Sequence, residues 1–203
     1  MRSIYLLIII TLFVVSTKAQ QQHINNPFID VQNYSFAITL NDENDEINAI
    51  AAITVMFLKK SGIITFDFIG KNTAGKGMVA TAVIENKNKL LFEQNATRIK
   101  IELNQPAEAG ELRTIDINYS GTPADGLVFS KNKFAERTIF ADNWPNRARN
   151  WLPCIDHPSD KASVEFSVIA PDHYKVISNG ILVERNSRNT NQGNGNRPCR
   201  FCG

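Results

Sequence analysis

The stretch Ile47-Asn-Ala-Ile-Ala-Ala-Ile-Thr-Val-Met-Phe57 decides the fold class of this chain. Every second residue from Ile47 to Phe57 is apolar, and a period of two places these side chains on one face of a β-strand. Several residues between them are also apolar, which leaves room for a covering layer on the other face. The stretch therefore predicts a buried β-strand.

Similar strand patterns lie on both sides of this stretch. Residues 98–103 and 112–119 alternate apolar side chains with charged or polar ones, which is typical of strands with one wet face. The further predicted strands are 31–40, 63–69, 79–85, 163–169, 174–177 and 181–183. Turn-forming residues separate them, and no convincing amphipathic helix lies between them. We therefore predict an all-β fold, an antiparallel sandwich or barrel.

The length of the chain limits the number of domains, and its charge limits the kinds of partner it can bind. It has 203 residues, 43% of them hydrophobic, which suffices for one domain with a sizeable core, with or without a tail. Its formal net charge is only +2. Proteins that bind nucleic acid or anionic membranes usually carry a basic patch and a marked basic excess, so we expect no nucleic-acid partner.

The first 19 residues have the pattern of a secretory signal peptide. Arg2 is followed by an apolar run over residues 5–15, and Thr17 and Ala19 have the small side chains of a cleavage site. The run is shorter than the roughly 20 apolar residues that a membrane-spanning helix needs. We therefore favour a cleaved signal over an uncleaved anchor. The predicted mature chain begins near Gln20, is secreted or periplasmic, and has no membrane span.

Residues 185–203 differ in character from the rest of the chain. They are rich in Asn, Arg and Gly and contain one large apolar residue, Phe201, so we predict a disordered or aberrant tail. Cys199 and Cys202 form a single C-x-x-C pair there, which is at most half of a zinc site. We interpret the pair as incidental.

Residues 140–161 form a long irregular segment with two Trp, three Pro, two Arg and three Asp. Such a segment in a β-rich domain is usually functional or buried by a partner. Its arginines, Arg147 and Arg149, could grip a substrate carboxylate. We favour the alternative, in which they pair internally with acids of the same segment, namely Asp142, Asp156 or Asp160.

The usual catalytic motifs are absent from the sequence. The three histidines are His23, His157 and His173, and none lies in an H-E-x-x-H sequence; G-x-S-x-G, P-loop and G-x-G-x-x-G motifs are also missing. His157 has carboxylates nearby and could be a ligand or a base, although we favour a loop histidine held by hydrogen bonds. We assign no catalytic residue and no metal site to these 203 residues.

The irregular segment resembles a known signature. The sequence Ala148-Arg149, followed by Leu152-Pro-Cys-x-Asp156-x-Pro158 and Lys161, is similar to that of the N-terminal domain of aminopeptidase N-like zinc metallopeptidases, which include leukotriene A4 hydrolase. The resemblance covers roughly residues 28–184. It implies a saddle-like antiparallel β-sandwich that docks on a separate thermolysin-like catalytic domain. That catalytic domain would supply the H-E-x-x-H motif and bind the zinc cofactor of the complete enzyme.

In this family, a loop just upstream of the Ala-Arg pair reaches the active site with a Gln and, two residues later, a Glu that binds the α-amino group of the peptide. The corresponding positions here are Asp142 and Trp144. Residues two apart on a strand share a face, so Asp142 could still pair with the ammonium group, and Trp144 could add a cation–π wall. The alternative for Trp144 and Pro145 is simple packing against the neighbouring domain.

The remaining signature residues have structural roles in this reading. Pro153 and Pro158 restrict the backbone, and Cys154 is a small buried filler. Asp156 accepts hydrogen bonds from the backbone or from Arg149.

These observations lead to one main functional hypothesis and two alternatives. The main one is that residues 20–184 are the substrate-binding and docking domain of an exported zinc aminopeptidase that removes N-terminal amino acids from peptides. The chain would be truncated before its catalytic domain and inactive alone. The first alternative is a stand-alone exported β-sandwich module that binds peptide or glycan. The second is an inactive relic that fails to fold, with exposed strand edges and apolar surface.

Overall fold

The computed structural model describes residues 28–185 and 196–202. Within these ranges the chain forms strands and one 3-10 turn, η1 (Ala148–Asn150), which confirms the all-β prediction. No helix in the described part of the chain is long and apolar enough to cross a bilayer. The predicted signal peptide, residues 1–19, and residues 186–195 of the predicted tail lie outside the described residues.

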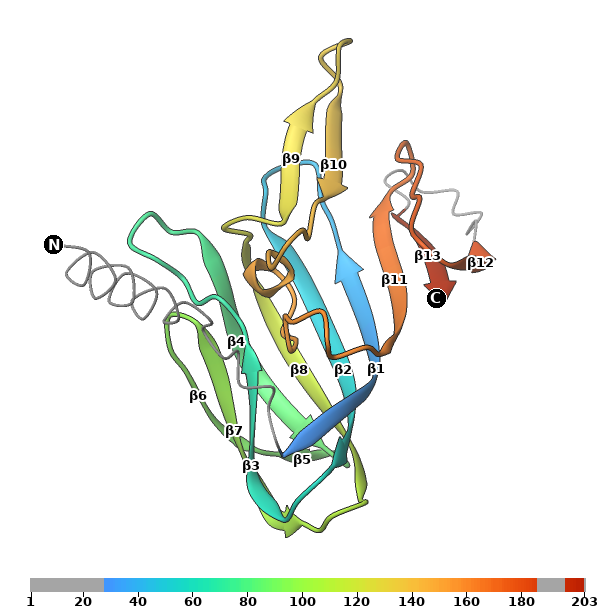
Figure 1. The fold of residues 1–203 in the computed structure, drawn as a ribbon. Helices are drawn as coiled ribbons and strands as arrows, with labels where there is room; N and C mark the ends of the chain where they lie inside the picture. Colours follow the sequence, from blue (N-terminus) through green and yellow to red (C-terminus); the bar gives the residue numbers. More distant parts are fainter. Residues whose placement is uncertain (1–27, 186–195, 203) are drawn as a thin grey trace, which may run out of the picture.

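The larger of the sheets has eight strands in the order β12-β13-β11-β1-β2-β8-β4-β5 (Figure 1). Their bounds are β1 (Ile29–Thr39), β2 (Ile47–Phe57), β4 (Gly77–Glu85), β5 (Asn88–Lys89), β8 (Leu112–Thr122), β11 (Ser163–Pro171), β12 (Ile181–Arg185) and β13 (Asn196–Cys202). Neighbouring strands are antiparallel except β1 and β11, which run parallel from the pair Asn33 and Ser163 to the pair Thr39 and Ile169. The antiparallel prediction therefore holds with one exception.

A smaller sheet covers one face of the large one. Its strands are β3 (Ser61–Asp67), β7 (Arg98–Ala107) and β6 (Leu91–Gln94), in that order. Side chains from both sheets belong to one hydrophobic core, which confirms the sandwich. The fully buried members include Ile47, Ile53 and Phe57 of β2, Ile64 and Phe66 of β3, and Ile99 and Ile101 of β7.

The two faces of β2 differ as its period predicts. The six residues of the apolar face, from Ile47 to Phe57, are all buried. On the opposite face, Asn48 and Ile50 are exposed and the following alternate residues are half-buried. The described residues therefore cover this face of β2 only in part.

One side chain bonds the edge of β4 at residues 78–80, where β5 does not reach. The Gln94 Oε1 accepts a hydrogen bond from the Ala80 amide at 2.9 Å, and its Nε2 donates to the Met78 carbonyl at 3.0 Å. A glutamine from β6 thus makes two of the hydrogen bonds that a neighbouring strand would make, which leaves less of this edge open.

A two-stranded hairpin, β9 (Leu127–Lys131) and β10 (Arg137–Ala141), projects beyond the sandwich (Figure 1). Arg137 connects it to the turn between β1 and β2. Its Nη2 donates to the Asn44 carbonyl at 2.6 Å and to Asp45 Oδ1 at 2.7 Å, and its guanidinium lies 5.0 Å above the centre of the Phe129 ring. The sequence patterns did not predict this hairpin.

The structure differs from the sequence predictions at two places near the C-terminal end. Residues 174–177, predicted as a strand, form none. Residues 196–202, predicted as disordered tail, form β13 between β11 and β12. Two neighbouring strands supply backbone hydrogen bonds on both sides of β13, and Cys199 and Phe201 are buried on one face. Tertiary pairing thus overcomes the polar composition.

Candidate functional site

The irregular segment between β10 and β11 is attached to the small sheet through Cys154. The Asp67 amide donates to the Cys154 carbonyl at 2.8 Å, and the Cys154 amide donates to the Asp67 carbonyl at 3.1 Å. Cys154 is buried, and this burial raises the pKa of its thiol well above the ordinary value. An inert, buried filler at this position agrees with the sequence interpretation.

Arg149 and Asp156 hold the segment in shape. The Arg149 amide and its Nε both donate to Asp156 Oδ2, at 3.2 and 3.0 Å, and Arg149 Nη2 donates to the Asp156 carbonyl at 3.0 Å. Asp67 completes the group, because its Oδ2 accepts from the Asp156 amide at 3.3 Å. Asp156 therefore accepts backbone and Arg149 hydrogen bonds, as the sequence analysis expected.

The neighbouring residues pack this network into the core. Trp151 is buried, its Nε1 donates to Asn143 Oδ1 at 2.9 Å, and its ring stacks on Phe166 with centroids 6.4 Å apart. Pro153 is buried, whereas Pro158 lies exposed in a turn. The segment is thus irregular in conformation but rigidly attached at its centre.

Asp160 contacts β1 instead of an arginine of its own segment. The Tyr34 hydroxyl donates to Asp160 Oδ2 at 3.5 Å and accepts from the Ile155 amide at 3.0 Å. Partial burial raises the pKa of the Asp160 carboxyl.

The exposed end of the segment, residues 142–147, folds back over the base of the hairpin. The Asp142 amide donates to the Gly126 carbonyl at 2.8 Å, and the Arg147 amide donates to the Asn143 carbonyl at 3.0 Å. Gly126 has φ +79°, and a Cβ there would lie 2.4 Å from the Arg147 carbonyl oxygen. Only glycine allows the two backbones to approach so closely.

Asp142 and Arg147 of this loop form a charged cluster with Asp125, which lies just before β9. Arg147 Nη1 donates to Asp142 Oδ2 at 2.9 Å, and Arg147 Nε lies 3.5 Å from Asp125 Oδ2. Trp144 lies between Asp142 and Arg147 in sequence, and its side chain is 77% exposed. The loop and Asp125 together present two carboxylates, one guanidinium and an open indole ring. Internal pairing of Arg147 and Arg149 is what the sequence analysis favoured, and both arginines pair in this way.

The two histidines in the described part of the chain, His157 and His173, do not join this cluster. His157 Nδ1 accepts from the Ser159 amide at 3.2 Å and lies 2.7 Å from Ser159 Oγ, the loop role that the sequence analysis favoured. His173 Nε2 lies 3.5 Å from Asp42 Oδ1, and its ring centroid is 4.3 Å from that of Tyr174.

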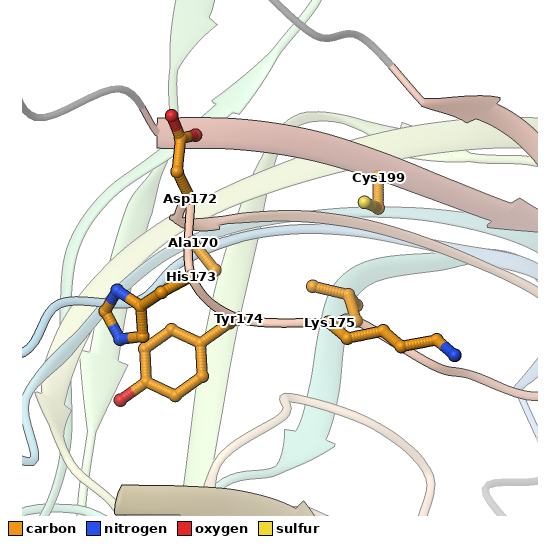
Figure 2. A pocket seen from close by; sticks show the side chains of 7 residues that line it. Ala170, Asp172, His173, Tyr174, Lys175 and Cys199 are labelled. Atoms are coloured by element: carbon orange, nitrogen blue, oxygen red, sulfur yellow. The ribbon is translucent and has the colours of Figure 1, made fainter.

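A cavity of about 250 Å³ lies elsewhere, between the turn at residues 170–176 and Cys199 of β13. Figure 2 shows the rings of His173 and Tyr174 together on one side of it, with Cys199 on the other. None of the site residues predicted from the sequence lines this cavity.

The described residues do not fit a zinc site. No group of three or more His, Cys, Asp or Glu side chains among residues 28–185 and 196–202 is placed to hold a metal ion. Cys199 and Cys202 lie three residues apart on β13, so their side chains point to opposite faces of the strand and cannot share one ion.

Asp125, Asn143 and Asp67 bind side chains or backbone of the site, and the sequence patterns did not predict these contacts. Asp125 and Gly126 stand in a recognisable turn cluster, but a turn pattern does not show which distant loop it will contact. The role of Asp67 could not be predicted for the same reason, because its partners Cys154 and Asp156 lie far along the chain.

A family model matches most of the chain. The family model for the Peptidase M1 N-terminal domain matches residues 30–200. That match continues past residue 184, where the sequence analysis expected the resemblance to end.

Solved structures share the fold. The M1 zinc metallopeptidase from Deinococcus radiodurans aligns with a TM-score of 0.70 and 24% identity, over 86% of this chain and 39% of that one. A mutant of that enzyme bound to the substrate Tyr-Ser-Ala gives 0.69 and 23%, with the same coverage. Yeast LTA4 hydrolase in complex with bestatin gives 0.69 and 18%, over 88% of this chain and 27% of that one. The chain thus spans well under half the length of these structures.

Proposed function

This chain belongs to the Peptidase M1 N-terminal domain family, and we propose that it is the substrate-binding and docking domain of an exported zinc aminopeptidase. In this proposal the 142–147 loop binds the free N-terminus of a peptide. The observation that carries the proposal is that the half-exposed Asp142 carboxylate and the exposed Trp144 ring lie on one loop, next to a segment fixed by Arg149 and Asp156.

The chemistry of the loop suits an ammonium group. The Asp142 carboxylate is half exposed and can accept charge-assisted hydrogen bonds from an α-amino group. Trp144 offers an open ring face, and an indole attracts a cation within about 6 Å of its centroid. An acetylated N-terminus is neutral and would gain neither interaction.

Peptide hydrolysis in this proposal depends on a catalytic domain outside these 203 residues. The sequence has no H-E-x-x-H motif, and the described residues form no zinc-binding group. The zinc ion of an M1 metallopeptidase would supply the Lewis acid and the activated water. This chain would contribute orientation of the substrate, and we expect it to be inactive alone.

A docking surface for that domain is proposed on the hairpin and its following loop. Phe134, Phe140 and Trp144 are large exposed aromatic side chains, and all lie within eleven residues of one another. Large exposed aromatic side chains on one projecting element are enriched at interfaces. Export rests on the N-terminal sequence pattern, and a mature N-terminus near Gln20 after expression in a secreting host would support it.

The test is the binding of Tyr-Ser-Ala and its N-acetylated form to the intact chain. The chain has two tryptophans, and Trp151 is buried while Trp144 is exposed, so a ligand at the loop changes only the red-shifted part of the tryptophan emission. We expect quenching by the free-amine peptide alone, with weak, roughly millimolar affinity. The Asp142→Asn variant should abolish the effect. Equal quenching by both peptides would contradict the proposal.

A second candidate is the stand-alone binding module for peptide or glycan that the sequence analysis kept as an alternative. Binding of oligosaccharides, or of peptides regardless of their N-terminus, would favour this candidate.

A further inference from the structure

The charged cluster at the 142–147 loop holds more negative than positive groups. Asp125 and Asp142 carry one formal charge each, and among the described residues Arg147 is the one cation within ion-pair distance of both. The three groups therefore carry a formal charge of −1. One additional cation would make the cluster neutral, with one partner for each carboxylate.

The two contacts of Arg147 are unequal. The Nη1 to Asp142 distance is 2.9 Å, a normal charge-assisted hydrogen bond, whereas the Nε to Asp125 distance of 3.5 Å is too long for one. Asp125 keeps its Oδ2 directed to Arg147 because its Oδ1 accepts from the Gly126 amide at 2.8 Å. Asp125 is thus a fixed acceptor next to an incompletely engaged guanidinium.

The backbone of Arg147 is held in place while its side chain is half exposed. Its amide donates to Asn143, and its carbonyl accepts from the Asn150 amide at 3.1 Å and from Asn150 Nδ2 at 3.0 Å. Gly126 packs directly under that carbonyl. A shift of the guanidinium from Asp142 towards Asp125 therefore needs side-chain rotation only.

We propose that Arg147 is a built-in competitor for the amine site: its guanidinium occupies Asp142 in the free protein, and Asp125 receives it when a primary ammonium group binds. Asp125 and Arg147 then determine how readily Asp142 is released to a peptide. This inference rests on the proposed function, because it assumes that Asp142 is the group that binds the ammonium.

The competition predicts effects of opposite sign for two neighbouring variants. Arg147→Gln removes the competitor, so the affinity for Tyr-Ser-Ala should rise about two- to fivefold, the range expected for an exposed ion pair. Asp125→Asn removes the alternative acceptor, so Arg147 stays on Asp142 and the affinity should fall by a similar factor. If Arg147 merely supported the loop, both variants would lower the affinity.

The experiment measures Trp144 quenching by Tyr-Ser-Ala in the intact chain and in the variants Arg147→Gln, Asp125→Asn and Asp142→Asn. Lys60→Gln is the matched control, since it removes one exposed cation of the pair Lys60–Glu108 in the turn after β2. The control should leave the affinity unchanged. As a second measurement, the side-chain Nε–H resonance of Arg147 in the wild-type chain should shift as the peptide is added.

The outcomes separate this inference from the proposed function. If Asp142→Asn leaves binding intact, the proposed function fails. If Asp142→Asn abolishes binding but Arg147→Gln weakens it in a folded protein, the competition is wrong and Arg147 is a positioning residue. An Arg147 resonance that does not move during peptide binding would overturn the inference without any variant.

Discussion

Replacing Asp156 with alanine should destabilise the protein strongly, because it removes the acceptor that holds the signature segment. Asp156 Oδ2 receives hydrogen bonds from both the backbone amide and the Nε of Arg149. The two side chains are only 20% and 10% exposed, for Arg149 and Asp156 respectively. The substitution therefore leaves a largely desolvated guanidinium without its main partner.

The magnitude follows from these contacts. A hydrogen bond to a charged group contributes about 1.5–3 kcal/mol, and breaking a buried ion pair costs about 3–5 kcal/mol. Arg149 keeps its bond to the Asp156 carbonyl and lies 3.9 Å from Asp67, which reduces the loss. We expect a loss of about 3 kcal/mol in the free energy of unfolding. For a domain of this size, that lowers the melting temperature by about 6–12 °C.

The assay is thermal unfolding followed by circular dichroism, with Asp142→Ala as the matched control. In the pair of Asp142 with Arg147, the Asp142 side chain is 49% exposed and the Arg147 side chain 40%. Loss of this exposed pair should therefore cost less than about 1 kcal/mol. If Asp156→Ala melted within about 2 °C of Asp142→Ala, the assignment of Asp156 as the structural anchor would be wrong.

Three other substitutions have defined outcomes. Gly126→Ala places a Cβ 2.4 Å from the Arg147 carbonyl at φ +79°, so the 142–147 loop must move, and hydrogen exchange of the Asp142 and Arg147 amides should accelerate. Gln94→Ala removes two hydrogen bonds from the β4 edge and should cost about 1–2 kcal/mol in chemical denaturation; an unchanged midpoint would contradict the edge-sealing role. Asp160→Asn removes a carboxyl whose pKa is raised by burial. The folded protein keeps that proton at pH values where the unfolded chain has lost it, so the stabilising contribution of Asp160 is present at low pH and is lost as the pH rises through the raised pKa. Relative to this variant, the wild-type melting temperature should therefore fall as the pH rises above about 4, and parallel curves for the two proteins would refute this sign.

Much of the fold follows from local patterns in the sequence. The period of two over residues 47–57 predicts the bounds and the buried face of β2, because burial on one side of a strand leaves a direct trace in the sequence. The hairpin β9–β10 leaves no such trace. Its strands are short, and several of its residues, including Lys131 and Phe140, are exposed, so no alternation marks them.

The candidate site was predictable in its residues but not in its contacts. The signature residues Arg149 and Asp156 do contact each other, since they are seven positions apart within one segment. Asp125 lies outside that segment, and its approach to Arg147 depends on the close packing at Gly126. The strand β13 shows the same limit, because its order comes from pairing with β11 and β12 instead of from its own composition.

The parallel pairing of β1 with β11 has a consequence for the order in which the chain folds. Asn33 and Ser163 are 130 positions apart, so β1 can pair with β2 early but must wait for most of the domain before its second edge is satisfied. Closing so long a loop is entropically costly and slow. We therefore expect strands β11, β13 and β12 to join last, onto a nucleus of β1, β2 and β8. Until they join, the backbone groups along that edge of β1 have no strand partner, and such an edge can pair with another chain.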